Sequence, residues 1–329
     1  MAEIVLGIGS SHGPLLSTPP EQWDLRAKAD RANKNHWFRG KTYDYEALLA
    51  ARAPGFAHEI AVETRRARFL KCRSALEALG KKFDEVSPDA VVIIGNDQRE
   101  FFNAGLTPSI TVYRGGQISN VQHLAEDAPG LNIAEPANSP AEGATYPGAT
   151  ALADHILDSL ADEFDLAQSD QTPSGAPRGG IPHAYGFFYH TILQDKTPPS
   201  VPIILNVHFP HNTPKLRRCL ELGRALHLAI TSFTGARRVA LMASGGLTHF
   251  VIDEDFDRTV MAAMKAGDED ALAKLPENYF KVGTAEIKNW YPVIAAMNAA
   301  GRRYHQVDYV PCYRSEAGTG NAMCFAYWQ

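Results

Sequence analysis

The sequence has few cysteines, and their spacing does not form a metal site. Its 329 residues contain four of them, Cys72, Cys219, Cys312 and Cys324. They are far apart or lack the short intervals that are typical of structural zinc sites. We therefore exclude a zinc ribbon and expect reduced, packed thiols, as is usual in cytosolic proteins.

Long apolar runs and a basic surplus are lacking as well. No run of about 18 apolar residues is present, so the sequence predicts no transmembrane helix. The opening residues MAEIVLGIGSSHGP have neither a basic segment nor a signal-like apolar core, which favours a cytoplasmic location. The 32 Lys and Arg residues are outnumbered by 37 Asp and Glu, giving a formal net charge of -5. We therefore expect neither a nucleic acid nor a membrane as a partner.

The N-terminal glycines do not complete a dinucleotide-binding motif. Gly7 and Gly9 lie at the end of a short apolar strand predicted for residues 4–8. The third glycine of that motif is missing, and Gly13 and Pro14 stand where its helix would begin. The strand instead leads into a loop that carries His12.

Apolar segments of strand length alternate with amphipathic segments of helix length along the chain. This alternation predicts an α/β fold over residues 1–329, a single domain with a mixed sheet flanked by helices on both faces. We predict loops at 115–148 and 169–182. Residues 17–55 are rich in aromatic and proline residues and are predicted to be a lid or an interface arm. The predicted strands are 4–8, 89–95, 110–113, 202–207, 239–243, 304–309 and 322–327, and the predicted helices are 45–52, 57–79, 149–163, 217–231, 256–266 and 285–300.

Four of the predicted strands end in polar side chains, namely His12, Asn96 to Gln98, His208 and His249. Ligands bind at the carboxyl ends of strands in open α/β sheets, so we expect these side chains to share one pocket. Two histidines and a carboxylate are the ligand set of many non-heme Fe(II) enzymes, and Glu286 is the carboxylate that we select. A helix-starting glutamate stabilised by the helix dipole is the alternative. The histidines without a strand-end position are expected to be structural: His36, His123, His155, His227 and His305.

These motifs resemble those of the class III extradiol ring-cleaving dioxygenases, the family that contains protocatechuate 4,5-dioxygenase. The segment GIGSSHGP at residues 7–14 is similar to the family's first metal-histidine motif. The segment GGLTH at residues 245–249 is similar to its catalytic-histidine motif. Residues 89–97, 182–183, 206–223, 286–290 and 313–323 match further family segments in the same order.

The resemblance implies an Fe(II) enzyme that cleaves a catecholic aromatic ring in the extradiol (meta) manner with O₂. A carboxylated, lignin-derived compound, such as a methylgallate or protocatechuate analogue, is the expected substrate, and a homodimer is the expected assembly. His12 and Glu286 are implied as metal ligands. His249 is implied as the general base and acid, a role that suits an imidazole, and His183 is implied to hydrogen-bond the substrate.

Two further groups of residues are candidates for substrate contact. The C-terminal turn with Arg314, Ser315, Thr319 and Asn321 has the donors to bind a carboxylate, although an ordinary polar turn is an equal alternative. The rings of four residues in one segment are expected to stack on an aromatic substrate, with core packing as the equal alternative: Tyr185, Phe187, Phe188 and Tyr189.

The chain departs from the family at the second metal histidine, which falls on Gln98. Gln98 is a ligand itself, or it supports a site in which His58 supplies the imidazole, or the site has lost its iron. We favour His58, because imidazole binds Fe(II) better than a neutral amide does. Two other functions stay open, a non-oxidative metal-dependent enzyme of hydrolase type and a non-catalytic binding protein on the same fold.

Overall fold

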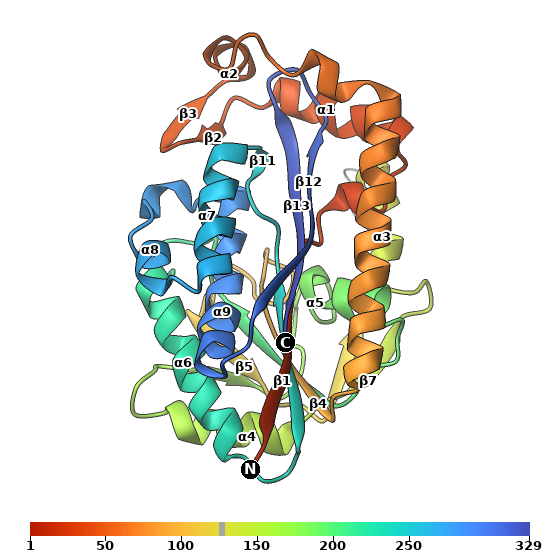
Figure 1. The fold of residues 1–329 in the computed structure, drawn as a ribbon. Helices are drawn as coiled ribbons and strands as arrows, with labels where there is room; N and C mark the ends of the chain where they lie inside the picture. Colours follow the sequence, from red (N-terminus) through yellow and green to blue (C-terminus); the bar gives the residue numbers. More distant parts are fainter. Residues whose placement is uncertain (125–128) are drawn as a thin grey trace.

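The computed structural model describes residues 1–124 and 129–329, and a large β-sheet forms its centre (Figure 1). Strands β1, β10, β4 and β9 are parallel neighbours in that order. Antiparallel pairs join β13 to β1, β11 and β12, and β5 to β9. The mixed sheet confirms the predicted fold class. Its order is β11 (His249–Val251), β13 (Thr319–Trp328), β1 (Glu3–Ser10), β10 (Arg238–Ser244), β4 (Ala90–Asn96), β9 (Ser200–Leu205), β5 (Ile110–Tyr113) and β8 (Ala167–Ser169), with β12 (Tyr304–Tyr313) beside β13.

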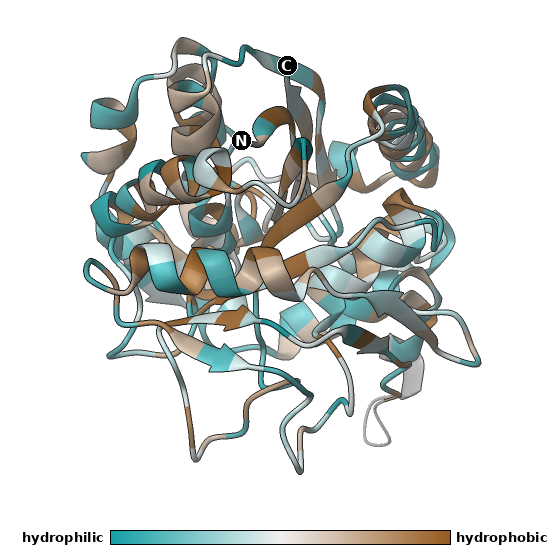
Figure 2. Cartoon of the chain, turned by 90° about the horizontal axis from the view of Figure 1, so that it is seen from below, coloured by the Kyte–Doolittle hydropathy of each residue, from teal (hydrophilic) through white to brown (hydrophobic). Residues whose placement is uncertain are grey.

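Helices cover both faces because the central strands are apolar on both sides. In β4, Val92 and Ile94 pack with one cluster of buried side chains, and Val91 and Ile93 pack with another. This separation follows from the period of two along a strand. Figure 2 shows the hydrophobic colour along the central strands and more hydrophilic colour on the outer helical turns. The first face carries α4 (Thr150–Leu160), α6 (Leu216–Ser232), α7 (Glu254–Ala266), α8 (Glu269–Ala273) and α9 (Trp290–Ala299), and the second carries α3 (Val62–Val86), α5 (His183–Phe187) and the π-helical turn η5 (Phe188–Ile192).

Residues 17–55, called the arm below, contain more regular structure than the single short helix that the sequence predicts. Their elements are η2 (Pro20–Gln22), α1 (Trp23–Ala32), β2 (His36–Phe38), β3 (Lys41–Tyr43) and α2 (Tyr45–Ala51). The arm lies at the far end of the β12–β13 hairpin, at the top of Figure 1. Arg31 and Tyr45 both bind the carboxylate of Glu316, and Arg39 binds Asp253. A lid or interface role for the arm stays a prediction.

Several boundaries differ from those predicted. Residues 115–148 are not all loop, since β6 (Gln117–Asn120) pairs with β7 (Ala144–Pro147) and η4 spans Pro129–Ala137. Residues 125–128 of that segment lie outside the described residues. Helix α3 continues beyond Leu79 because Phe83 and Val86 extend its buried stripe. The remaining short turns are η1 (Pro14–Leu16), η3 (Ala57–Ile60), η6 (Glu277–Tyr279) and η7 (Val282–Asn289).

The four cysteines are packed in the interior, as the sequence predicts. Cys72, Cys219, Cys312 and Cys324 are all free and buried, as expected for packed thiols. None of the helices within residues 1–124 and 129–329 combines the length and apolar character needed to span a bilayer.

A buried carboxyl group on α7 holds the loop that leads to His249. Asp257 accepts hydrogen bonds from the Thr248 backbone N–H at 2.9 Å, the Thr248 hydroxyl at 2.7 Å and the Tyr309 hydroxyl at 2.7 Å. Burial raises the pKa of Asp257 from 3.8 to about 7, although these hydrogen bonds oppose the rise. The folded chain therefore binds this proton more tightly than the unfolded chain does.

This difference predicts that Asp257 makes stability depend on pH. Between about pH 4 and pH 7 the folded state binds more protons at this site, so the free energy of unfolding should fall as pH rises, by up to about 4 kcal/mol. Asp257→Asn should remove that slope, whereas Asp255→Asn, at an exposed position of the same helix, should keep it. Urea unfolding from pH 4.5 to pH 7.5 measures all three proteins. Equal slopes in wild type and Asp257→Asn would contradict the prediction.

Candidate active site at the strand ends

The carboxylate of Glu286 lies at the centre of the polar side chains that follow the parallel strands. Its Oε2 lies 3.6 Å from His12 Nε2 and 3.4 Å from His249 Nε2. Its Oε1 lies 3.6 Å from His208 Nε2 and accepts a hydrogen bond from Gln98 Nε2 at 2.9 Å. The structure therefore brings together side chains from the segments that follow β1, β4 and β9, the first residue of β11, and a carboxylate from η7.

A cavity of about 300 Å³ opens beside this cluster. His123, which the sequence places among the structural histidines, lines it, and so does Glu100, which sequence reasoning missed. Glu100 follows Gln98 by two residues, so an acidic residue just beyond a strand end is the signal that could have found it. The other polar or charged residues that line the cavity include His12, Ser17, Arg26, Gln98, Glu135, Asn138, Arg178, His183, His249, Glu286 and Asn321.

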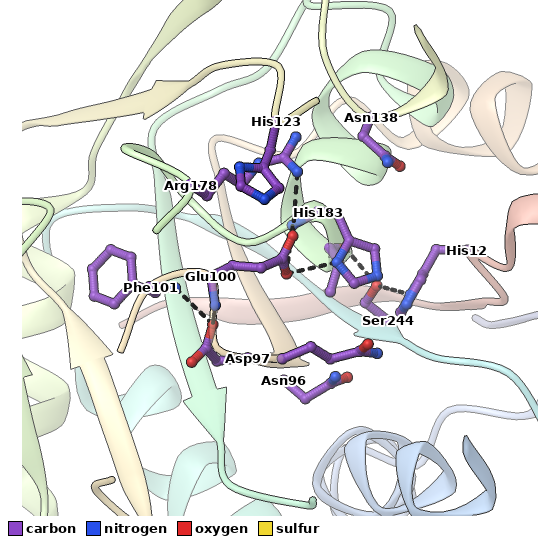
Figure 3. A network of polar contacts seen from close by, with 12 residues as sticks. His12, Asn96, Asp97, Glu100, Phe101, His123, Asn138, Arg178, His183 and Ser244 are labelled. Atoms are coloured by element: carbon purple, nitrogen blue, oxygen red, sulfur yellow. Dashed lines mark hydrogen bonds and ion pairs between the residues drawn. The ribbon is translucent and has the colours of Figure 1, made fainter. Parts of the chain in front are cut away.

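His12 is held as a neutral imidazole whose Nε2 has a free lone pair. The Ser244 hydroxyl donates its hydrogen to the Ala184 carbonyl at 2.5 Å, so Ser244 Oγ accepts from His12 Nδ1–H at 2.9 Å (Figure 3). Burial is the main reason that the pKa of His12 falls to about 4. The unprotonated Nε2 consequently faces the Glu286 carboxylate.

His249 is oriented by the backbone of its own motif. Its Nδ1 donates to the Leu247 carbonyl at 2.7 Å, which leaves Nε2 as the nitrogen facing Glu286. Burial lowers the pKa of His249, but the Glu286 carboxylate and the hydrogen bond to Leu247 together outweigh this effect and raise it overall. Gly283 makes room for the ring, because a Cβ at that position would lie 2.3 Å from His249 Cδ2.

His183 belongs to a buried chain of alternating charges. Its Nδ1 lies 2.6 Å from Glu100 Oε2, and Glu100 Oε1 lies 3.2 Å from an Arg178 nitrogen (Figure 3). Arg178 also pairs with Glu135. Burial works against ionisation of Glu100, but His183 and Arg178 lower its pKa to about 2, and Glu100 raises the pKa of His183. His183 therefore keeps Nε2 available for a ligand, with its ring 4.9 Å from that of His12.

The side-chain amides of Asn289 and Asn96 orient the imidazole of His208, which lies next to Glu286. Asn289 Nδ2 donates to Asn96 Oδ1 at 2.7 Å, so Asn96 presents Nδ2 to His208 Nε2, which lies 3.0 Å away. His208 Nε2 accordingly accepts a hydrogen bond from Asn96. The sequence left the role of His208 open, and the structure places its Nε2 3.6 Å from Glu286 Oε1.

His58 is not brought to this cluster. It lies in the single turn η3, in which no residue is buried. Its side chain is 75% exposed, and its Nε2 lies 3.1 Å from Glu59. The expectation that His58 supplies the missing imidazole therefore has no geometric support, because His58 is not among the residues that line the cavity.

Most of the C-terminal turn predicted to bind a carboxylate is occupied by the protein itself. Arg314 donates to both oxygens of Asp30, at 2.5 and 2.8 Å, and Thr319 donates to Asp30 at 2.5 Å. The Ser315 hydroxyl pairs with that of Thr319 at 2.7 Å. Arg314, Ser315 and Thr319 do not line the cavity, whereas Asn321 does.

Tyr185 is a core residue in this structure. It is fully buried, and its hydroxyl donates to the Ile203 carbonyl at 2.6 Å. The expected contact with an aromatic substrate is thus not available to it. Of the other rings predicted to stack, Phe188 and Tyr189 are also fully buried, whereas Phe187 lines the cavity. Phe250 lines it as well.

The donor atoms around Glu286 suit a divalent metal ion. No group of three or more His, Cys, Asp or Glu side chains in the described parts of the chain could hold a metal by itself. The His12 imidazole and the Glu286 carboxylate nevertheless offer two lone-pair donors 3.6 Å apart, with no hydrogen of their own between them. The adjacent Gln98 amide brings an oxygen as a further donor. Imidazole, carboxylate and amide oxygen are all ligands of divalent first-row metals.

Comparison with known proteins points to aromatic ring opening. The family model described as the catalytic LigB subunit of aromatic ring-opening dioxygenase matches residues 51–322. A 2,3-dihydroxyphenylpropionate/2,3-dihydroxicinnamic acid 1,2-dioxygenase from Comamonas testosteroni is 27% identical over 177 residues, 53% of this chain and 47% of that protein. A gallate dioxygenase from Pseudomonas putida is 29% identical over 195 residues, 54% of each chain. The chain spans about half the length of these curated relatives.

Proposed function

We propose that this chain, which belongs to the family of catalytic LigB subunits of aromatic ring-opening dioxygenases, is itself a metal-dependent enzyme that opens a catecholic ring with O₂. The observation that carries the proposal is the convergence of His12, His249 and Glu286 beside the cavity at the strand ends. Cleavage is extradiol, and the substrate is a carboxylated, lignin-derived aromatic such as a methylgallate or protocatechuate analogue. The names of the two relatives, which act on a dihydroxyphenylpropionate and on gallate, support this substrate class.

The proposed metal is Fe(II), held by His12 Nε2, the Glu286 carboxylate and the Gln98 amide oxygen. The Gln98 nitrogen is bound to Glu286 Oε1 at 2.9 Å, so the oxygen is the amide atom left for a metal. The chemistry that Fe(II) supplies when bound is to hold catechol and O₂ side by side and to pass electron density between them.

The protein residues around the cavity handle protons and orientation. His249 takes a phenol proton at Nε2 and later returns it, while the Leu247 carbonyl fixes its other nitrogen. His183, paired with Glu100, donates a charged hydrogen bond from Nε2 to a substrate oxygen. The rings of Phe187 and Phe250 provide apolar wall for an aromatic ring.

Oxygen consumption tests the proposal directly. The purified chain is loaded with Fe(II) under argon and mixed with oxygenated buffer and a panel of catechols, with and without a carboxylate. We expect one O₂ to be consumed for each ring opened. Bound iron without oxygen uptake on any member of the panel would refute the proposed activity. The expected homodimer and cytoplasmic location are part of the same proposal, and sedimentation analysis tests the dimer.

Variants of Gln98 test the third metal donor. Gln98→Ala should weaken Fe(II) binding by more than the roughly 10- to 100-fold that loss of a residue behind the ligands costs, and Gln98→His should bind Fe(II) more tightly than wild type, because imidazole is the stronger ligand. His58→Ala is the matched control and should leave binding unchanged. Competition with a chromophoric chelator measures all four affinities. A loss in His58→Ala, or none in Gln98→Ala, would contradict the assignment.

A further inference from the structure

The side-chain amide of Asn321 borders the cavity next to the proposed general base. Asn321 lies on β13, is 3% exposed, and is the Cα partner of His249 on the antiparallel strand β11. Residues directly opposite each other in such a pair project from the same face of the sheet, with Cβ atoms roughly 4.5–5.5 Å apart. Both side chains line the cavity. The amide therefore lies beside the place where His249 Nε2 would meet a phenol.

Arg314 determines which end of this amide faces a ligand. Its Nε and one terminal nitrogen donate to the two oxygens of Asp30, and its other terminal nitrogen donates to Asn321 Oδ1 at 3.3 Å. A guanidinium has donors only, so the amide oxygen must be the atom that faces it. Nδ2 is consequently the atom that Asn321 presents to a ligand, and this nitrogen donates a hydrogen bond but does not accept one.

An apolar methyl group lies near this nitrogen. Gly13 leaves space beside both, because a Cβ at that position would lie 3.1 Å from Asn321 Nδ2 and 2.9 Å from Met323 Cε. Met323 is fully buried and also lines the cavity. A thioether side chain adapts its shape to an apolar neighbour. These surroundings suit an oxygen acceptor that carries a small apolar group.

We infer that Asn321 Nδ2 donates a hydrogen bond to a third ring oxygen of the substrate, a hydroxyl or methoxy group next to the phenol that faces His249. The two catechol oxygens occupy the His12–Glu286 end of the cavity in the proposed function. The ring position that follows the His249 phenol then points towards the cross-strand neighbour of His249, which is Asn321.

This contact makes Asn321 a specificity residue. A group that only donates serves a hydroxyl and a methyl ether alike, since the oxygen of each accepts a hydrogen bond. The inference rests on the proposed function and deepens it. Within the proposed substrate class, it selects rings with three adjacent oxygens, such as a methylgallate, over rings with two, such as protocatechuate.

Binding measurements with three neutral probes test this hydrogen bond without turnover. Fe(II)-loaded protein under argon is titrated with 3-methoxycatechol, with pyrogallol and with 3-methylcatechol, which has a methyl group in place of the third oxygen. Wild type should bind 3-methoxycatechol and pyrogallol more tightly than 3-methylcatechol, each by roughly 2- to 10-fold, the range for a hydrogen bond between neutral groups.

Two variants separate donation by Asn321 from a merely structural role. Asn321→Leu has no polar group and should bind all three probes within about twofold of one another. Asn321→Asp has acceptors only, so it should keep the preference for pyrogallol, whose hydroxyl can donate. The same variant should lose the preference for 3-methoxycatechol, whose ether oxygen cannot donate. A general loss of structure would not move the two probes in different directions.

Asn35→Leu is the matched control, since it makes the same replacement at an exposed position of the arm. It should behave as wild type. An Asn321→Leu protein that keeps the wild-type preference, or an Asn321→Asp protein that binds 3-methoxycatechol and pyrogallol alike, would overturn the role of Asn321. Oxygen uptake by a wild type without any preference would refute this contact alone. A normal preference without oxygen uptake would instead refute the proposed ring opening and leave the contact in place.

Discussion

Replacement of Glu286 by glutamine is expected to remove bound metal and to lower ring cleavage by roughly 10³-fold or more. Glu286 is the one carboxylate shared by His12, His249 and Gln98 in this cluster. Glutamine keeps the shape but supplies no negative charge to a divalent ion. Metal-based stabilisation is worth several kcal/mol, and about 1.4 kcal/mol corresponds to a tenfold rate change. Metal content per chain and oxygen uptake measure the two losses.

His12→Ala should give the same double loss, because it removes the lone pair that faces Glu286. His305→Ala is its control, since that imidazole lies on β12, does not line the cavity beside Glu286, and stacks on Tyr327. Circular dichroism should show that all variants are folded. Full metal occupancy in Glu286→Gln or His12→Ala would overturn the ligand assignment.

His249→Ala is expected to keep its metal and to lose turnover by roughly 10²- to 10⁴-fold, the contribution of a positioned general base. The Leu247 carbonyl holds the ring so that Nε2 faces the cluster, and alanine leaves no group there to take a proton. Metal analysis and single-turnover kinetics distinguish the roles. Near-wild-type turnover would make His249 structural, and loss of metal would make it a ligand.

The central part of the site could be predicted because it depends on local sequence patterns. The apolar runs before His12, Asn96 and His208 are strands that end where predicted to within a few residues. Parallel pairing of β1, β10, β4 and β9 then places their ends on one edge. The motifs at residues 7–14 and 245–249 also indicated the family, which the match over residues 51–322 confirms.

The outer part of the site could not be predicted, because it depends on contacts between distant segments. Arg314 resembles a substrate-binding arginine in sequence, but its charge is taken by Asp30, 284 residues away. Arg178 and Glu135 lie in segments without helical or strand periodicity, so nothing local indicates that they join Glu100. His58 is the reverse case, since a residue with suitable chemistry for a ligand lies on an exposed turn.

The contacts that join the arm to the β12–β13 hairpin limit which segments of this protein can be exchanged with those of a relative. Residues 17–50 precede the part of the chain that matches the family model, yet Asp30 supplies the counter-ion of the buried Arg314. An arm grafted from a relative would therefore leave the Arg314 guanidinium without the Asp30 carboxylate, unless the β12–β13 hairpin were exchanged together with the arm. Chimeras should therefore stay folded only when arm and hairpin come from the same parent, so the two segments would be exchanged as a pair.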